Sequence, residues 1–281
     1  MAVTIKWKDN SIIELGHRIY RSNNYFTKDN LPAPLADIGP NVEEYEDPDS
    51  NPGENWYIVS SYIAEFEAFS KPFLGGLSSA FNHDIFNDDS AIATYPFNGN
   101  TNELSNTYNG TRTGSGGYVN GLLEQAIELK GNDRAALPDN LIPEKSSFSV
   151  SFWFKVDSVS NRRWIAYFRY TTKLIVEVNN GSFRIWNDDW SSTFENVNSD
   201  TWYHVVVVYN HDITEFEFFL NAQSVHTNTK EVQRENKVNF IGGGQNNEYD
   251  MNGYVDQLRI FNKAITQEEV DILYIEGVGL Q

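Results

Sequence analysis

The 281-residue sequence contains no cysteine, five scattered histidines and no long apolar run. Without cysteine there can be no disulfides, thiolate metal sites or cysteine nucleophiles. The histidines form no His-x-x-x-His pair, which disfavours a zinc site. No window approaches about 18 consecutive apolar residues, and Met1–Asn10 lacks the apolar segment of a secretory signal. We therefore expect neither a membrane span nor a secretory leader.

Basic residues are also scarce, since 21 Lys and Arg face 39 Asp and Glu, for a net charge of −18. Such a surface repels phosphate backbones and anionic lipids, so we expect no nucleic-acid partner and no membrane insertion. Hydrophobic residues make up 40% of the chain and aromatic residues 14%. That content is enough for packed cores and argues against a disordered chain.

Short β-rich runs separated by turn residues fill the sequence and predict an all-β protein. The segment around residues 73–88 mixes proline, a Gly-Gly pair and acidic residues without sustained periodicity, which is typical of a linker. We therefore predict a small N-terminal domain over residues 1–72, a linker over 73–88 and a larger domain over 89–281.

In the N-terminal domain, Val3, Ile5 and Trp7 alternate as one strand, and the runs 17–22 (HRIYRS) and 56–64 (WYIVSSYIA) follow as two more. This order resembles a fibronectin type III domain, an immunoglobulin-like β-sandwich. The resemblance implies that Tyr57 is the corner tyrosine and that Val59 and Ser61 point inward with it. The strand that normally comes first is missing. The linker or second domain could cover the open edge, or a neighbouring subunit could pack there.

In the C-terminal domain the apolar positions of residues 148–156 alternate, which predicts a strand with one face in a core. The run 202–209 is apolar on both faces and predicts a central strand covered on each side. Strands of this kind predict two stacked antiparallel sheets, a jelly-roll sandwich. Thr266 and Glu269 match a capping box, which predicts a short helix through about Tyr274 that covers a sandwich edge.

Residues 91–275 resemble a laminin G-like, concanavalin A-like jelly-roll domain. The matching segments are 95–100 (YPFNGN), 126–131 (AIELKG), 148–154 (FSVSFWF), 201–207 (TWYHVVV) and 252–266 (NGYVDQLRIFNKAIT). The resemblance implies binding far more often than catalysis and names no ligand. The Glu-x-Asp-x-x-Glu pattern of retaining glycosidases is absent from residues 89–281, so we do not expect an enzyme.

Strand alternation places Asp256 on the same face as Leu258 and Ile260. A carboxylate facing a core needs a partner, because unpaired burial costs several kcal/mol, roughly. The resemblance implies one structural Ca²⁺ held by Asp256 and by the loop containing Asn98, Gly99 and Asn100. In the alternative interpretation, Asp256 accepts backbone N–H groups and no metal is present.

Two segments have the composition of a sugar-binding surface, in which aromatic rings stack on sugars while Asp, Asn and Arg bind hydroxyl groups. The first is a predicted loop of Asn187, Asp188, Asp189 and Trp190 with an exposed indole, and the second, also predicted to be a loop, contains Arg163 and Trp164. In the alternative interpretation these tryptophans belong to the core, as we expect for Trp153 and Trp202.

Two binding-type β modules on a chain without cysteine or a secretory signal predict a bacteriophage virion decoration protein of the capsid or tail, assembled in the host cytoplasm. Its N-terminal domain would attach to other virion proteins or to its own copies, in an oligomeric or multicopy arrangement. The jelly roll would bind host-surface glycans weakly. One alternative is a secreted or cell-surface bacterial carbohydrate-binding adhesion protein, and another is a spacer without a ligand.

Overall fold

A computed structural model describes residues 3–278, apart from 8–13, 25, 51–54, 65, 71–72, 76–82, 87, 140, 143–144, 170–172, 188–189, 232–237 and 245–248. The chain divides into two compact units. Unit 1 comprises residues 1–82 and 275–281, and unit 2 comprises residues 83–274. The division falls inside the segment predicted as a linker. The first residues of that segment, however, form strand β7 (Phe73–Gly75), which pairs with a strand of unit 1.

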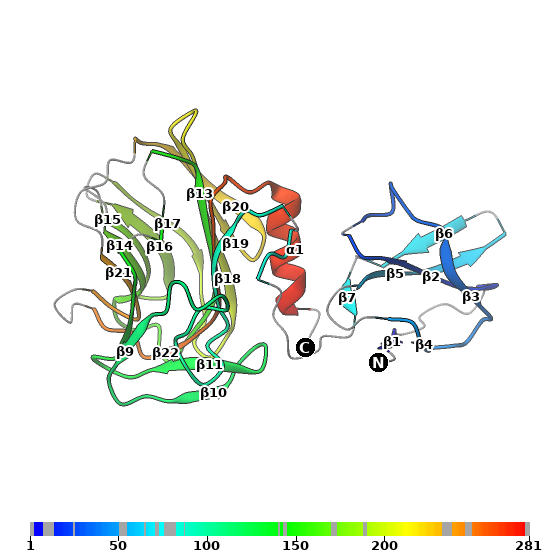
Figure 1. The fold of residues 1–281 in the computed structure, drawn as a ribbon, viewed down its shortest axis with the longest axis horizontal. Coiled ribbons are helices and arrows are strands. Elements are labelled where there is room, and N and C mark those ends of the chain that lie inside the picture. The colour runs from blue at the N-terminus through cyan, green and yellow to red at the C-terminus, as the bar shows by residue number, and fades with distance from the viewer. Residues whose placement is uncertain are drawn as a thin grey trace. The chain divides into compact units, whose positions relative to one another are not determined.

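Unit 1 contains two antiparallel sheets (Figure 1). In the smaller one, β1 (Val3–Lys6) pairs with β4 (Glu44–Asp47). The larger sheet has the order β3-β2-β5-β6, and β7 also pairs with β5. The bounds of its strands are Gly16–Ser22 for β2, Pro34–Ile38 for β3, Asn55–Ile63 for β5 and Phe66–Phe69 for β6.

The core of unit 1 lies between these sheets and contains Tyr57 and Val59, as predicted, while Ser61, also predicted to point inward, is half-buried. The Tyr57 hydroxyl donates a hydrogen bond of 2.6 Å to Asp47 Oδ2, which ties β5 to the end of β4. Within the described residues, β1 pairs with β4 alone. The fibronectin type III resemblance and the assembly surface at this edge stay predictions.

Unit 2 consists of two large antiparallel sheets, which confirms the all-β jelly-roll prediction (Figure 1). In the described residues one sheet has the order β10-β11-β22-β13-β18-β19-β20, with β8 also paired to β22. Its strands are Ala91–Tyr95 (β8), Tyr118–Asn120 (β10), Gln125–Leu129 (β11), Phe148–Val156 (β13), Tyr203–Asn210 (β18), Glu215–Leu220 (β19), Gln223–Thr229 (β20) and Gly253–Phe261 (β22).

The second sheet of unit 2 has the order β17-β16-β15-β14-β21-β12-β9 in the described residues. Its strands are Thr111–Thr113 (β9), Arg134–Leu137 (β12), Arg163–Arg169 (β14), Lys173–Asn179 (β15), Ser182–Asn187 (β16), Trp190–Asn196 (β17) and Val238–Ile241 (β21). The core between the two sheets contains the alternate residues of β13 from Phe148 to Val156, as predicted. Strand β18 is central and buried on both faces, also as predicted.

The position of Asp256 differs from the prediction because β22 contains a β-bulge. Gln257 has a φ of 51°, and the register between β13 and β22 shifts at this point. The extra residue changes the alternation, so Asp256 lies opposite Trp153 while Leu258 and Ile260 face the core. The carboxylate is fully buried but lies on the outer face of the sheet and not on the core face.

Helix α1 (Gln267–Val278) begins at the predicted capping box. The Thr266 N–H donates to Glu269 Oε2 at 2.9 Å, and the Glu269 N–H donates to Thr266 Oγ1 at 3.3 Å. The helix covers an outer sheet face, and not an edge as predicted, because the Tyr274 ring stacks on Trp153 of the central strand β13 (Figure 1). Among the described residues, no helix is long and apolar enough to cross a membrane.

Candidate functional site

Aromatic side chains gather on the outer face of the sheet that contains β14 and β21. Tyr167 of β14 lies opposite Phe240 of β21 on one side and Ile175 of β15 on the other, and Ile175 lies opposite Trp186 of β16. This register brings rings from three strands into one row. We call the set an aromatic platform; its members are Trp164, Tyr167, Trp186, Phe240 and Tyr249.

A buried carboxylate, Glu177 of β15, organises the platform. Its Oε2 atom accepts hydrogen bonds from Arg162 Nε at 2.6 Å and from the Trp164 indole N–H at 2.9 Å. Its Oε1 atom lies 3.4 Å from Arg184 Nη1 of β16. The two guanidinium groups offset the cost of burying this charge, and the indole bond fixes the orientation of the Trp164 ring.

Tyr249 is the exposed ring of the platform, with 44% of its surface accessible. Its backbone has a φ of 51°, a left-handed conformation that is uncommon for a residue other than glycine. The ring lies 5.0 Å from the Trp164 ring, and the Arg162 guanidinium lies 4.5 Å above its centre. The backbone carbonyl of Tyr249 accepts a hydrogen bond of 2.8 Å from the backbone N–H of Trp164. These contacts hold a solvent-facing ring in a defined position.

Asp250 follows Tyr249 in the chain, and the charges of two arginines act on its carboxylate. Burial raises the pKa of the Asp250 carboxyl above its ordinary value, and the positive charges of Arg134 and Arg163 oppose that rise. Arg134 lies 5.1 Å above the Phe240 ring and donates a hydrogen bond of 2.6 Å to the Gly244 carbonyl. The group combines an aromatic face, hydrogen-bond donors and an acceptor, the chemistry that binds sugar hydroxyls.

The family of this fold follows from a match over unit 2. A family model described as the concanavalin A-like lectin/glucanases superfamily matches residues 129–271, about half of the chain. The chain belongs to this superfamily. The matched segment begins at the end of β11 and includes β14, β15, β16 and β21, the strands that build the aromatic platform. A comparison with curated proteins yields no match.

Several solved structures share this concanavalin A-like fold. Domain 4 of AbnA, a GH43 extracellular arabinanase from Geobacillus stearothermophilus in complex with arabinotriose, is 20% identical, with a TM-score of 0.58 over 66% of this chain and 98% of that domain. The binding domain of Paraclostridial Mosquitocidal Protein 1 is 15% identical, with a TM-score of 0.54 over 66% of this chain and 52% of that one.

The ligand binding domain of botulinum neurotoxin serotype D in complex with N-acetylneuraminic acid is 18% identical, with a TM-score of 0.52 over 66% of this chain and 50% of that one. The chain therefore spans about half the length of the two toxin domains. At these identities the likeness establishes the shared fold. The toxin neighbours are binding domains, and the arabinanase neighbour is one domain of a larger enzyme.

Within this concanavalin A-like unit, the predicted sugar-binding residues lie mainly on strands. Arg163 and Trp164 begin β14, where a loop was expected, and only 4% of Trp164 is accessible because it packs under Tyr249. Asn187 and Trp190 are paired ends of β16 and β17. Asp188 and Asp189 between them lie outside the described residues, so a sugar contact at Trp190 stays a prediction.

Sequence reasoning missed Tyr249 and Asp250, which follow the glycine-rich turn after β21. The only local signal is a Tyr-Asp pair in a polar loop, and such a pair is common. Trp202, expected in the core, is only half-buried, and the Lys155 ammonium lies 5.1 Å above its ring. Which tryptophan is covered depends on packing between strands that are distant in the sequence.

Two of the residues predicted to bind calcium, Asp256 and Asn98, accept backbone N–H groups from the loop at residues 122–125, and Asn100 accepts one from its own segment. Asp256 Oδ2 accepts the backbone N–H groups of Leu122 and Leu123 at 2.8 and 3.1 Å. Asn98 Oδ1 accepts the Gln125 N–H at 3.0 Å, and Asn100 Oδ1 accepts the Asn102 N–H at 2.7 Å. These carboxylate and amide oxygens already accept backbone hydrogen bonds.

The calcium prediction depends on which side chains and carbonyl groups around this loop could be metal ligands. Among the described residues, no group of three His, Asp or Glu side chains could hold a metal ion. Calcium would have to draw on Asp256, on amide oxygens and on backbone carbonyls of the loop that contains Gly99. Two backbone N–H groups satisfy Asp256 Oδ2, and calcium at this loop stays a prediction.

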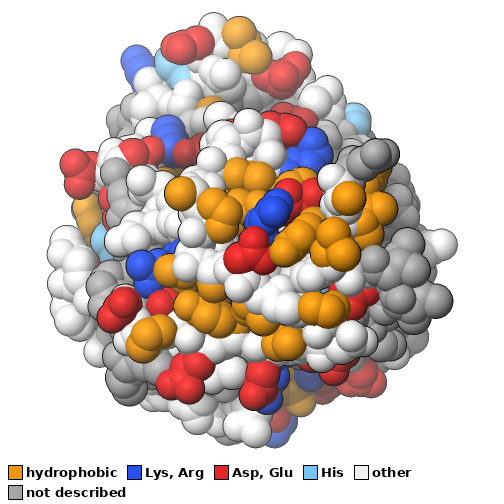
Figure 2. Space-filling model, turned by 90° about the vertical axis from the view of Figure 1, so that its right-hand side faces the viewer, with side chains coloured by type: hydrophobic (Ala, Val, Ile, Leu, Met, Phe, Trp, Pro, Cys, Tyr) orange, Lys and Arg blue, Asp and Glu red, His pale blue; other side chains and the backbone are white. Residues whose placement is uncertain are grey.

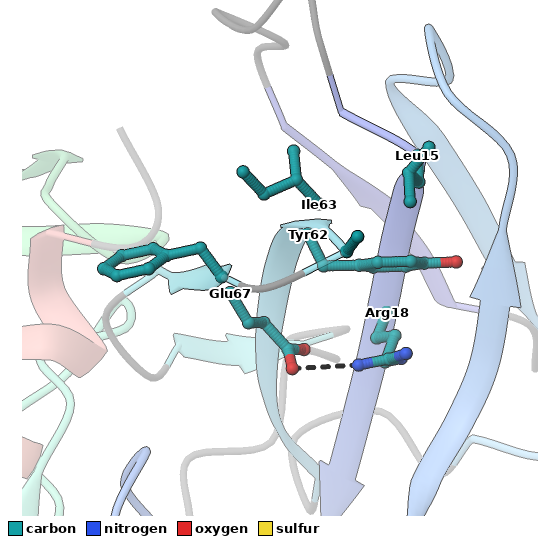
Figure 3. A pocket seen from close by; sticks show the side chains of 7 residues that line it. Leu15, Arg18, Tyr62, Ile63 and Glu67 are labelled. Carbon is teal, nitrogen blue, oxygen red and sulfur yellow. Dashed lines mark hydrogen bonds and ion pairs between the residues drawn. The ribbon is translucent and has the colours of Figure 1, made fainter.

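Unit 1 contains a separate pocket of about 420 Å³ at the β5–β6 hairpin. Figure 2 shows hydrophobic side chains gathered around charged ones on one face of the molecule, and the pocket is lined by Leu15, Arg18, Tyr62, Ile63, Ala64, Phe66 and Glu67. In Figure 3 the Arg18 guanidinium lies beside the Tyr62 ring and is joined to Glu67.

The charged side chains of this pocket pair with one another. Arg18 bonds Glu67 Oε2 at 2.9 Å and Asp37 Oδ2 at 3.3 Å, and the Tyr62 hydroxyl donates to Asp37 Oδ1 at 2.7 Å. Phe66 at the rim is 73% exposed. The pocket thus has an apolar rim, and the polar side chains inside it pair with one another. At the platform, by contrast, Arg163 makes fewer hydrogen bonds.

Proposed function

We propose that unit 2 binds carbohydrate at the exposed edge of the aromatic platform, with Tyr249 stacking on a sugar ring and Arg163 and Asp250 bonding its hydroxyl groups. The observation that carries the proposal is the fixed, exposed Tyr249 ring beside a carboxylate and a guanidinium. A ring already held in place loses little conformational freedom when a sugar stacks on it, which favours binding.

The comparisons support carbohydrate binding. Two neighbours of the same fold were solved with arabinotriose and with N-acetylneuraminic acid. This supports the secreted or cell-surface carbohydrate-binding adhesion protein that the sequence offered as an alternative. The bacteriophage decoration protein, with its virion location and partners, finds no support in the comparisons.

A glycan array with the full chain tests the proposal. Wild-type protein should bind a subset of glycans, and Tyr249→Ala should lose that binding because the stacking surface is removed. The control is Phe66→Ala, which removes a more exposed aromatic ring from the pocket of unit 1 and should leave binding unchanged.

The other outcomes distinguish the alternatives. Loss of binding in Phe66→Ala but not in Tyr249→Ala would move the site to unit 1. A silent array would favour the ligand-free spacer. Loss of binding in Trp190→Ala would add the β16–β17 hairpin to the site. Circular dichroism of each variant checks that the fold is intact.

A further inference from the structure

Two charged side chains at the edge of the platform make fewer hydrogen bonds than their chemistry allows. Within the described part of the chain, the only hydrogen bond of the Arg163 guanidinium is a long one of 3.4 Å to the Arg162 carbonyl. An arginine has five N–H donors, so most of this group is available to a ligand. Among the same residues, Asp250 receives no hydrogen bond and forms no ion pair.

Among the described residues, arginines outnumber carboxylates at this edge of the platform. Arg162 and Arg184 both pair with Glu177, while Arg134 and Arg163 both act on Asp250. Of the side chains that the structure describes, four arginines thus accompany two carboxylates at this edge, in a chain whose net charge is −18. Exposed charges farther than about 10 Å are largely screened at ordinary salt, so these six groups are the described charges that act most strongly on a ligand here.

From this geometry we infer that the site selects an acidic sugar, with its carboxylate on the Arg163 guanidinium. The inference rests on the proposed function and names its ligand class. Asp250 accepts the hydroxyl groups of the same residue, and Tyr249 stacks on the ring. A guanidinium binds a carboxylate through two parallel N–H···O bonds, which a neutral hydroxymethyl group cannot reproduce.

The test compares two ligands with the same sugar backbone and hydroxyl groups, trigalacturonic acid and its uncharged, fully methyl-esterified form, by isothermal titration calorimetry. Wild-type protein should bind the acid about tenfold more tightly than the ester, the scale expected for one charge-assisted pair. Arg163→Gln should remove this preference. Arg163→Lys should restore part of it, since lysine keeps the charge but loses the two-pronged contact.

Two further variants separate local from general effects. Asp250→Ala should weaken binding of the acid and the ester to the same extent, because both present the same hydroxyl groups. Lys28→Gln removes one positive charge from an exposed position of unit 1 and should leave the preference unchanged. A Lys28→Gln effect equal to that of Arg163→Gln would mean that net charge, and not Arg163, sets the preference.

Equal affinity of wild-type protein for acid and ester, or failure to bind either, overturns the inference. The proposed function survives either result if the array shows Tyr249-dependent binding of neutral glycans. It fails together with the inference if the array is silent or if glycan binding does not depend on Tyr249.

Discussion

Trp153 of β13 and Asp256 of β22 lie opposite one another in the sheet register, both on the outer face of unit 2. The bulge at Gln257 produces this pairing. It directs the Asp256 carboxylate to the backbone N–H groups of Leu122 and Leu123 and away from the core, where simple alternation would have placed it.

Asp256→Ala should destabilise unit 2 by about 2 kcal/mol or more, because two backbone N–H groups lose a charged acceptor. Urea unfolding followed by tryptophan fluorescence measures the change. The exposed acid Asp29 provides the control, since Asp29→Ala removes the same charge and should cost little. Equal stability of the two variants would contradict a structural role for Asp256.

Calcium at Asp256 and the 98–100 loop would appear as a ligand-linked rise in melting temperature. A ligand that binds only the folded chain stabilises it in proportion to the logarithm of its concentration. If the site exists, millimolar CaCl₂ should raise the melting temperature, EDTA should lower it, and Asp256→Ala should abolish both responses. Identical melting curves in CaCl₂ and EDTA would rule out a stabilising calcium site.

Glu177→Gln should disturb both stability and glycan binding. The change leaves the Arg162 and Arg184 guanidinium groups without their carboxylate, at an expected cost of about 3 kcal/mol. It also weakens the support for the Tyr249 ring through Arg162. Urea unfolding and the glycan array measure the two effects. Glu217→Gln, a change at a more exposed glutamate that accepts a hydrogen bond from Ser224, should affect neither.

His204 should make unit 2 less stable in mild acid. Burial beneath Tyr274, together with the charge of Arg259, lowers the pKa of His204 to about 3 from an ordinary value of 6.5. His204 therefore binds a proton below about pH 6.5 in the unfolded chain, but only below about pH 3 in the folded chain. The contribution of neutral, buried His204 to the free energy of unfolding is fully present above pH 6.5. It is lost progressively as the pH falls from 6.5 toward 3.

Melting temperatures between pH 7 and pH 4 check this prediction. His204→Gln, which retains a polar partner for Ser151, should flatten the decline over that range. The control His226→Gln alters a less buried histidine on β20 and should keep the wild-type slope. A His204→Gln profile parallel to that of the wild type would show that other groups cause the acid sensitivity.

Patterns within single segments were enough to predict the two-sheet fold and the start of α1. The alternation from Phe148 to Val156 determines which side chains face the core, and the Thr266–Glu269 capping box depends on residues three apart. Such features need no knowledge of the partner strand, because local geometry alone produces them.

The positions of the side chains in the candidate site depended on the tertiary structure. Trp164 is covered and Tyr249 is exposed because β14 and the loop after β21 meet across the sheet, although 85 residues separate the two rings in the sequence. A single bulge at Gln257 likewise moved Asp256 to the other face of β22. A one-residue change of register reverses the face of a side chain, and only pairing with a distant strand sets that register.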